Sequence, residues 1–410
     1  MEEKKQVPQI RFKGYVDAWE QRKVGDLVED YIEKTTVQNQ YPVLTSSQQQ
    51  GIVLQEEYFA DRQVTTSDNI GYYVLPYGYF TYRSRSDTDV FVFNRNTLIN
   101  KGIISYYYPV FHPKNCDSNF LLRRLNHGVR KQLSMAAEGT GQKVLAHNKF
   151  KNMVVDVPKF NEQKKIGLLF ERLDHLITLH QRKSDKLVNI KRAMLEKMFP
   201  KNGSDVPEIR FKGFTDAWEQ RKLLSLCDKF MDGDWIEAKD QSNSGVRLIQ
   251  TGNVGVAEYL DKPNNKKWVS KETFESLNCE EVFEGDILIS RLPEPAGRAC
   301  IVPNMGAKMI TAVDCTIVRV SENISNEFLL QYLSSQKYFD EVNTCLAGGT
   351  RQRISRSNLA DFDIPVPVQK QEQQAIGHFF RNIDNFITLH QRKLEKLKNI
   401  KKSMLDKMFV

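Results

Sequence analysis

The chain repeats itself, and this internal duplication constrains its fold more than any other feature of the sequence. Residues 7–23 match residues 206–222 at 14 of 17 positions, with an offset of 199 residues. Residues 176–199 match residues 386–409 at 17 of 24 positions, with an offset of 210. A repeat of this kind indicates two copies of one structural unit. The length of 410 residues also favours at least two domains, because it exceeds what one hydrophobic core usually serves.

Between the matching ends the two copies differ, although both have the sequence pattern of mixed α and β structure. Short apolar runs bounded by turn residues predict strands within residues 71–80, 89–94, 246–250 and 285–291. A helical pattern covers residues 326–338. The order in each half is therefore shared segment, variable unit and shared segment. We predict an α+β fold with two globular units and an internal pseudo-twofold repeat.

Each half ends in a predicted long helix. The first begins after Pro158 and stops at Phe199, and the second follows Pro367. The 38 residues from 162 to 199 would span about 57 Å at 1.5 Å per residue. Steps of three and four residues separate the apolar positions, as in a heptad repeat. The predicted seam consists of Ile166, Leu169, Leu173, Leu176, His180, Lys183, Leu187, Ile190 and Met194, and of Ile376, Phe379, Ile383, Phe386, His390, Lys393, Leu397, Ile400 and Met404.

The heptad spacing favours a coiled coil between these two helices. An antiparallel pair would place Lys183 and Lys393 each opposite a His. A parallel pair would instead bring the two Lys side chains together in the seam, which is unfavourable. We therefore predict an antiparallel pair. The alternative is two independent amphipathic helices on separate domains.

The positive charge of the chain is concentrated in the predicted helices. The net charge is +8. Residues 162–198 contain nine Lys and Arg against five Asp and Glu, and residues 372–408 contain eight against four. These two segments account for the whole excess. The rest of the chain therefore carries no net charge. To bind an anionic partner, the variable units would need to concentrate their basic residues on one face.

The composition argues against several classes of protein. No apolar run is long enough to cross a bilayer, and the first residues lack the apolar segment of a secretory signal, so we expect a cytoplasmic protein. The six cysteines form no C-x-x-C pair, which predicts reduced thiols and no metal site. The sequence has no Walker A loop and no Asn-Pro-Pro run of the adenine methyltransferase kind. We predict no catalytic residues.

Several segments resemble the specificity subunits of Type I restriction-modification systems, and the resemblance extends over essentially the whole chain. These segments are residues 209–214 with Trp218 downstream, 249–254, 284–291, 348–352, and 364–367 leading to Glu372. The repeated order of shared segment, variable unit and long helix is similar to that family too. The resemblance implies target recognition domains at residues 1–160 and 201–370. Spacer helices would follow them at residues 161–200 and 371–410.

The resemblance further implies a non-catalytic subunit that recognises double-stranded DNA. Each target recognition domain would read one half of an asymmetric bipartite site. Two DNA methyltransferase (modification) subunits would bind the repeated regions, and restriction/translocase subunits would join them. S-adenosylmethionine, ATP and Mg are expected on those partners and no cofactor in this chain. The first half departs from the pattern, because an alignment of Thr140 with Thr350 puts Gly141 where the second half has Arg351.

Turn-rich segments in both units supply the groups that duplex reading requires, namely donors and acceptors for base edges and cations for phosphates. Arginine forks suit both guanine edges and phosphates. The candidate DNA-binding residues are Tyr82, Arg83, Arg85, Thr140, Gln142 and Lys143 in the first unit, and Arg291, Arg298, Thr350, Arg351, Gln352, Arg353 and Arg356 in the second. The alternative is that these turns are solvated loops, and that the three tyrosines at residues 106–108 belong to a half-buried strand.

The candidate residues for partner docking and the coiled coil lie on the two predicted helices. They are Leu173, Leu176, His180, Leu187, Ile190, Ile383, Phe386, His390, Leu397 and Ile400. Two other functions stay open at this point. A stand-alone DNA-binding regulator with two readers would need no methylating partner, and a coiled-coil adaptor would need no basic face on its globular units.

Overall fold

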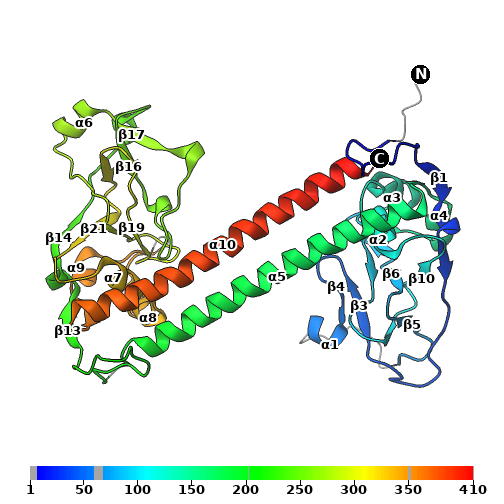
Figure 1. Ribbon diagram of the computed structural model, residues 1–410, viewed down its shortest axis with the longest axis horizontal. Coiled ribbons are helices and arrows are strands. Elements are labelled where there is room, and N and C mark those ends of the chain that lie inside the picture. Colours follow the sequence, from blue (N-terminus) through cyan, green and yellow to red (C-terminus); the bar gives the residue numbers. More distant parts are fainter. Residues whose placement is uncertain (1–6, 60–67, 202, 350–351, 410) are drawn as a thin grey trace. The chain divides into compact units, whose positions relative to one another are not determined.

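The computed structural model describes residues 7–59, 68–201, 203–349 and 352–409 and divides into two compact units. Unit 1 consists of residues 1–180 and 393–410, and unit 2 consists of residues 181–392. Each unit combines a β-rich part with short helices and with one half of each long helix (Figure 1). This confirms the predicted mixed α and β fold with two repeats.

A four-stranded antiparallel sheet with the same strand order forms the frame of each unit. In unit 1 the order is β2 (Val28–Asp30), β10 (Val110–Pro113), β6 (Phe80–Tyr82) and β8 (Phe93–Arg95). In unit 2 it is β14 (Cys227–Asp232), β21 (Cys315–Val320), β18 (Ile287–Ser290) and β19 (Ala299–Ile301). The same topology thus recurs where the two sequences barely match.

A two-stranded sheet joins the start of each shared segment to the strand that precedes the long helix. In unit 1, β1 (Glu20–Lys23) pairs with β12 (Val154–Val157). In unit 2, β13 (Glu219–Lys222) pairs with β22 (Asp363–Val366) in the same antiparallel register. This pairing brings the two ends of each variable segment together. Both variable segments therefore begin and end at the same type of two-stranded sheet.

The remaining strands differ between the units. Unit 1 has the pairs β3 (Leu44–Ser47) with β4 (Gly51–Leu54), and β5 (Tyr73–Pro76) with β9 (Lys101–Ile104). Unit 2 has instead a sheet in the order β15, β17, β16 and β20, which are Gln241–Ser242, Lys267–Val269, Val246–Ile249 and Met309–Thr311. The two units therefore differ in the strands outside the shared frame.

Short helices complete the units, and several begin at a side chain that caps them. The Asp117 carboxylate accepts a hydrogen bond from the Phe120 backbone N–H, and the Ser325, Ser335 and Ser355 hydroxyls cap three helices of unit 2 in the same way. Ser335 divides the predicted helical segment 326–338 into two helices. The short helices are α1 (Gln55–Tyr58), α2 (Ser118–Asn126), α3 (Arg130–Ala136), α4 (His147–Asn152), α6 (Lys271–Ser276), α7 (Asn326–Tyr332), α8 (Gln336–Thr344) and α9 (Arg356–Ala360).

The long helices are α5 (Phe160–Met198) and α10 (Lys370–Met408), which confirms both predicted helices. Their ends run antiparallel inside each unit. In unit 1, Asp174 pairs with Lys401 at 2.6 Å, and the Phe170 and Phe409 ring centroids lie 5.9 Å apart. In unit 2, Lys191 pairs with Asp384 at 2.7 Å, and Phe199 lies 6.4 Å from Phe380. The two sets of contacts are equivalent under the repeat.

The seam of the helix pair lies one residue away from the predicted heptad in its middle part. Leu176 and Phe386 are exposed by 40% and 53%, so their assignment to the seam was wrong. Leu173 and Ser184 are buried, His180 and Leu187 are half-buried, and their counterparts in α10 behave alike. Half-buried Ile177 takes the place predicted for Leu176. Lys183 and Lys393 are exposed as well. Two adjacent apolar residues occur at 176 and 177, and heptad spacing alone does not choose between them.

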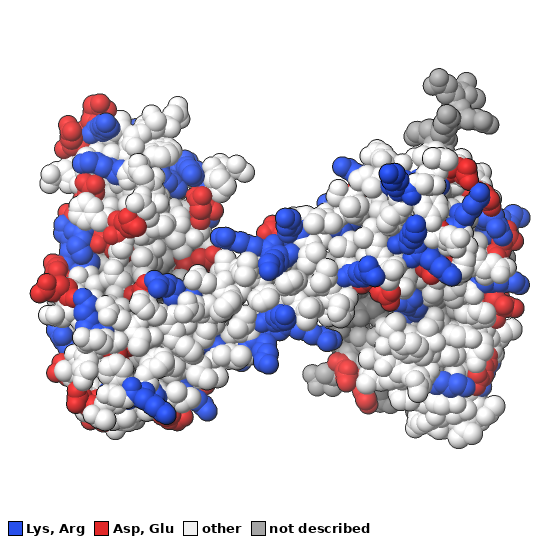
Figure 2. Space-filling view, in the orientation of Figure 1, with Lys and Arg blue, Asp and Glu red and all other residues white. Residues whose placement is uncertain are grey.

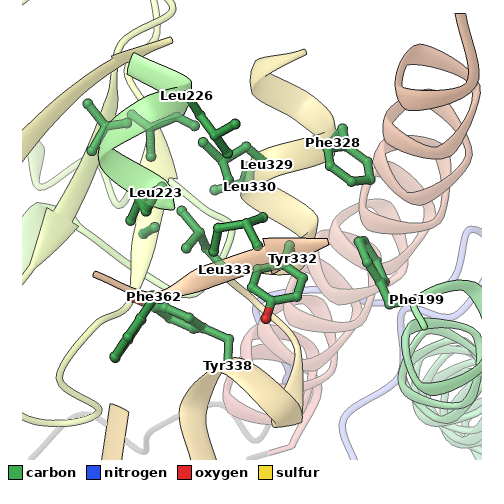
Figure 3. Packing of buried hydrophobic residues seen from close by; sticks show 14 of the residues in the cluster. Phe199, Leu223, Leu226, Phe328, Leu329, Leu330, Tyr332, Leu333, Tyr338 and Phe362 are labelled. Atoms are coloured by element: carbon green, nitrogen blue, oxygen red, sulfur yellow. The ribbon is translucent and has the colours of Figure 1, made fainter. Parts of the chain in front are cut away.

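The opening segment of each half caps the end of a long helix. The Ile209 backbone N–H donates to the Lys197 carbonyl at 2.9 Å, and the Ile10 N–H donates to the Lys407 carbonyl at 3.0 Å. Trp218 contacts Phe199, which also lies against Phe328 and Tyr332 in the core of unit 2 (Figure 3). In unit 1 the Trp19 and Phe409 rings make the equivalent contact, with centroids 6.0 Å apart. Unit 1 therefore includes both ends of the chain.

All six cysteines are free thiols, and burial raises the pKa of Cys116 and Cys227 to about 12. Within the described residues, no helix has both the length and the apolar character needed to cross a membrane. The same residues contain no group of three or more His, Cys, Asp or Glu side chains that could hold a metal ion.

Candidate nucleic-acid interface

In unit 1 the fold brings together two candidate segments that are far apart in the sequence. Strand β7 (Arg85–Ser86) pairs with β11 (Lys143–Val144) in antiparallel register. Gln142 Nε2 donates to Asp87 Oδ1 at 2.8 Å, and Arg83 lies 3.9 Å from the same carboxylate. Arg83, Arg85 and Thr140 are exposed, whereas Gln142 and Lys143 are half-buried. The structure therefore places five of the six candidates of unit 1 along one edge.

Two tyrosines belong to this edge, although the alternative left open by the sequence placed them in a half-buried strand. Tyr106 and Tyr107 lie in the turn between β9 and β10 and are 56% and 40% exposed. The Arg85 guanidinium carbon lies 4.3 Å from the centroid of the Tyr107 ring. Ser84 Oγ donates to the Tyr107 carbonyl at 2.7 Å, which ties the turn to the arginine segment. A run of three tyrosines next to turn residues was the only available signal for them.

The prediction that Tyr82 contacts DNA was wrong. Its side chain is fully buried among Phe93, Phe111 and Phe150. The hydroxyl lies 3.3 Å from His147 Nδ1, and His147 Nε2 lies 2.9 Å from Asp30 Oδ1. Tyr82 alternates with exposed Arg83 along the chain, and successive side chains of a strand point to opposite faces. Tyr82 therefore supports the core beneath the exposed edge.

In unit 2 three described candidates are exposed around two acidic side chains. Arg353 NH1 lies 4.0 Å from Asp314 Oδ1, and Arg356 NH1 lies 3.9 Å from Asp232 Oδ2. The Arg353 and Arg356 side chains keep 61% and 47% of their surface exposed, and Gln352 is exposed too. These long contacts orient the two guanidinium groups and leave most of their N–H donors available.

Arg291 and Arg298 hold the backbone of unit 2, so their predicted contact with DNA was wrong. Arg291 is buried, donates to the Val313 carbonyl at 2.7 Å and lies 3.4 Å from Asp232. Arg298 donates to four backbone carbonyls, those of Thr251, Val254, Leu292 and Pro295, at 2.6 to 3.0 Å. An arginine has five N–H donors, and those of Arg298 are mostly used within the protein.

The glycine-rich loops of the two halves correspond with an offset one residue smaller than the predicted alignment. An isolated bridge joins Glu138 to Val144, and another joins Ala347 to Arg353, which is an offset of 209. Gly139 and Gly348 occupy the same place with φ of 119° and 113°. A Cβ at Gly139 would lie 2.2 Å from the Gln142 carbonyl oxygen, so both the φ and the space require glycine. The predicted contacts of Thr350 and Arg351 lie outside the described residues.

The long helices carry a second candidate surface in duplicate. Leu176 and Leu179 are 40% and 36% exposed on α5, and their counterparts Phe386 and Leu389 are 53% and 44% exposed on α10. The two pairs are related by the 210-residue offset of the repeat. Lys and Arg side chains are spaced along the same helices (Figure 2). We call these four apolar residues the helix patches.

Residues 17–189 and 215–399 match the family described as the Type I restriction modification DNA specificity domain. The two matches cover both repeats and most of the chain. The chain belongs to this family. Each half thus carries a DNA specificity domain, the part of a Type I restriction-modification enzyme that recognises DNA, as the resemblance implied.

Two relatives within the family match most of the chain at low identity. The chain is 24% identical over 331 residues to the Type I restriction enzyme MjaVIII specificity subunit of Methanocaldococcus jannaschii, a match covering 75% of this chain and 74% of the relative. It is 23% identical over 297 residues to the putative type I restriction enzyme MjaX specificity subunit of the same organism, covering 70% and 66%. The crystal structure of the S subunit of a Type I restriction-modification system from M. genitalium has a TM-score of 0.57 at 12% identity, covering 98% and 99%. The likeness to that structure shows a shared fold.

Proposed function

We propose that this chain is the subunit that reads an asymmetric, two-part DNA sequence and positions methyltransferase and restriction subunits on it in the cytoplasm. The observation that carries this proposal is the constant frame with divergent outer strands. Identical units would read a palindrome, as symmetric dimers do. Units that differ in their outer strands and in their exposed arginine edges would read two different half-sites.

Arg83, Arg85, Thr140, Gln142 and Lys143 form the proposed DNA edge of unit 1. The proposed DNA edge of unit 2 consists of Gln352, Arg353 and Arg356, with Thr350 and Arg351 as further proposed contacts. Exposed guanidinium groups beside amide and hydroxyl groups suit both base edges and phosphates. The long helices add positive charge, which attracts DNA without regard to sequence.

The helix patches are the proposed docking sites for two copies of one methyltransferase. Apolar side chains exposed at equivalent positions of both repeats give each copy the same surface. The chain would supply recognition, while S-adenosylmethionine, ATP and Mg would bind to the partner subunits. This arrangement leaves no chemical step to the residues of this chain.

Reconstitution with the methyltransferase subunit of its own restriction-modification system tests the proposal. Native mass spectrometry should find two methyltransferase copies for each copy of this chain. Sequencing of the DNA modified by that complex should give one asymmetric bipartite site, and the chain alone with S-adenosylmethionine should transfer no methyl group. Specific DNA binding without any partner association would favour a stand-alone regulator instead, and methyl transfer by the isolated chain would contradict the proposal.

A further inference from the structure

We propose that Tyr107 is a positioning residue that holds Arg85 in the orientation needed to read a guanine in one half-site. The inference rests on the proposed function, because it assigns one contact within the proposed DNA edge of unit 1. It concerns two side chains from distant parts of the sequence that meet at the protein surface.

The guanidinium group of Arg85 lies over the Tyr107 ring. Its central carbon is 4.3 Å from the ring centroid, within the range of a cation–π contact. Arg85 is exposed, and among the described residues it makes no ion pair. Its neighbour Arg83 is instead engaged with Asp87 at 3.9 Å. The ring thus restrains Arg85, and no ion pair among the described residues competes for its N–H donors.

The backbone on both sides of this contact is restrained as well. Arg85 lies in β7, where it is paired with Val144. The Ser84 backbone N–H and hydroxyl both donate to the Tyr107 carbonyl, at 3.3 and 2.7 Å. The Tyr106 hydroxyl donates to that of Tyr107 at 3.2 Å. Ring and guanidinium are therefore arranged before DNA arrives, which lowers the entropy cost of binding.

This arrangement suits a base more than a phosphate. Stacking uses the face of the planar guanidinium and leaves its in-plane donors free, and these fit the N7 and O6 acceptors of guanine. A phosphate accepts donors from many directions and gains little from a fixed plane. Half-buried Lys143 on the adjacent strand offers a point charge that suits a phosphate. The geometry thus separates a base-reading cation from a backbone-binding one.

A double-mutant cycle between protein and DNA tests the proposal. The complex reconstituted with its methyltransferase is titrated with its own site, in which each guanine in turn is replaced by 7-deazaguanine, which lacks the N7 acceptor. One substitution, in one half-site only, should weaken wild-type binding about tenfold, a typical cost for one base contact. R85A should bind unmodified DNA about as weakly and should lose nothing further at that position.

Tyrosine variants separate positioning from simple structural support. Y107A should lose most of the sensitivity to 7-deazaguanine at that position, and Y107F should restore it because the ring is retained. Y77A is the matched control, since Tyr77 is 58% exposed in the same unit but lies in the turn after β5, away from Arg85. It should behave as the wild type.

The results that would contradict this proposal differ from those that would contradict the proposed function. An R85A complex as sensitive to every 7-deazaguanine as the wild type would show that Arg85 reads no guanine. Full sensitivity in Y107A would show that the ring does not position Arg85. Both outcomes leave sequence-specific binding by the complex intact, whereas a complex without any preferred sequence would contradict the proposed function itself.

Discussion

At the scale of single residues, the shared frame depends on contacts that occur once in each half. The Arg11 guanidinium donates two hydrogen bonds to Glu162 at 2.7 and 2.8 Å, and Arg210 does the same to Glu372. Both carboxylates are only 1% exposed. A buried carboxylate that loses its guanidinium cannot regain water, so each pair fastens an opening segment to the start of a long helix.

We expect Arg11→Ala to destabilise unit 1 by about 3 kcal/mol, because it leaves the Glu162 charge buried and unpaired. Hydrogen exchange should show the loss in residues 7–180 and not in unit 2, and Arg210→Ala should show the reverse. Arg22→Ala is the control, because that side chain is 41% exposed and 4.0 Å from Glu20; it should cost under about 0.5 kcal/mol. Equal loss of protection in both units would refute the assignment of one pair to each frame.

The hydrogen-bonded side chains Tyr82, His147 and Asp30, next to the proposed DNA edge, predict a pH dependence for unit 1. Burial lowers the pKa of His147 below its ordinary 6.5, although hydrogen bonding to Asp30 acts in the opposite direction. Between the lowered pKa and 6.5 the unfolded chain binds the proton and the folded chain does not, so the contribution to stability falls as the pH drops below 6.5. The free energy of unfolding of unit 1, measured with urea, should fall from pH 7 to pH 5. His147→Gln should make this free energy less dependent on pH. An unchanged pH dependence in that variant would rule out His147 as its origin.

At the scale of elements, the long helices have a buried side and an exposed side that we propose for partner binding. Ser184 and Leu394 are equivalent buried positions of the seam, 4% and 8% exposed. The helix patches on the outer side contain larger apolar residues in both copies. Burial in the pair explains the first set, and nothing in the described part of the chain covers the second. Stability and partner binding should therefore respond to different substitutions on the same helices.

We expect Leu394→Ala to cost about 2 kcal/mol of stability, since a buried leucine is truncated. Ser184→Ala at the equivalent position should change stability by less than about 0.5 kcal/mol and serves as its matched control. Denaturant unfolding monitored by circular dichroism measures both. Similar losses for the two variants would show that the seam does not follow this burial pattern.

The exposed patches should show the opposite behaviour. Combined Leu176→Asp and Phe386→Asp substitutions should leave unfolding nearly unchanged, because both side chains face solvent, and should abolish co-purification of the methyltransferase. Changing one of them should leave one bound copy per chain in native mass spectrometry. Two bound copies in the double variant would place docking elsewhere.

At the scale of the whole molecule, α5 and α10 are continuous through the boundary between the two units. A rigid pair of helices would fix the length of the unread DNA between the half-sites. Inserting one heptad after Leu187 and one after Leu397 keeps the seam pattern and adds roughly 10 Å. The preferred gap should grow by about three base pairs, at about 34 Å per turn of DNA.

Sequencing of methylated sites in cells that carry this variant and its modification subunit measures the gap directly. Both half-sites should keep their bases. A control variant with the heptad inserted after Leu187 alone leaves the two helices unmatched in the seam and should lose activity. Altered half-site bases with an unchanged gap would refute the helices as a ruler.

Repeats and periodicity are local properties of a chain, and they sufficed to predict the duplication, the mixed α and β units and the two long helices. The antiparallel pairing was predicted from Lys183 and Lys393 in the seam, but both side chains are exposed, so that argument does not explain it. Which side chains reach the surface depends on tertiary packing. Tyr82, Arg291 and Arg298 have the residue types of a DNA contact. However, Tyr82 packs in the core, and both arginines donate to backbone carbonyls. Leu176 and Ile177 are equally apolar, and the helix partner decides which one is buried. Tyr107 and Arg85 belong to different segments that only the folded structure brings together, so no local sequence pattern could predict their contact.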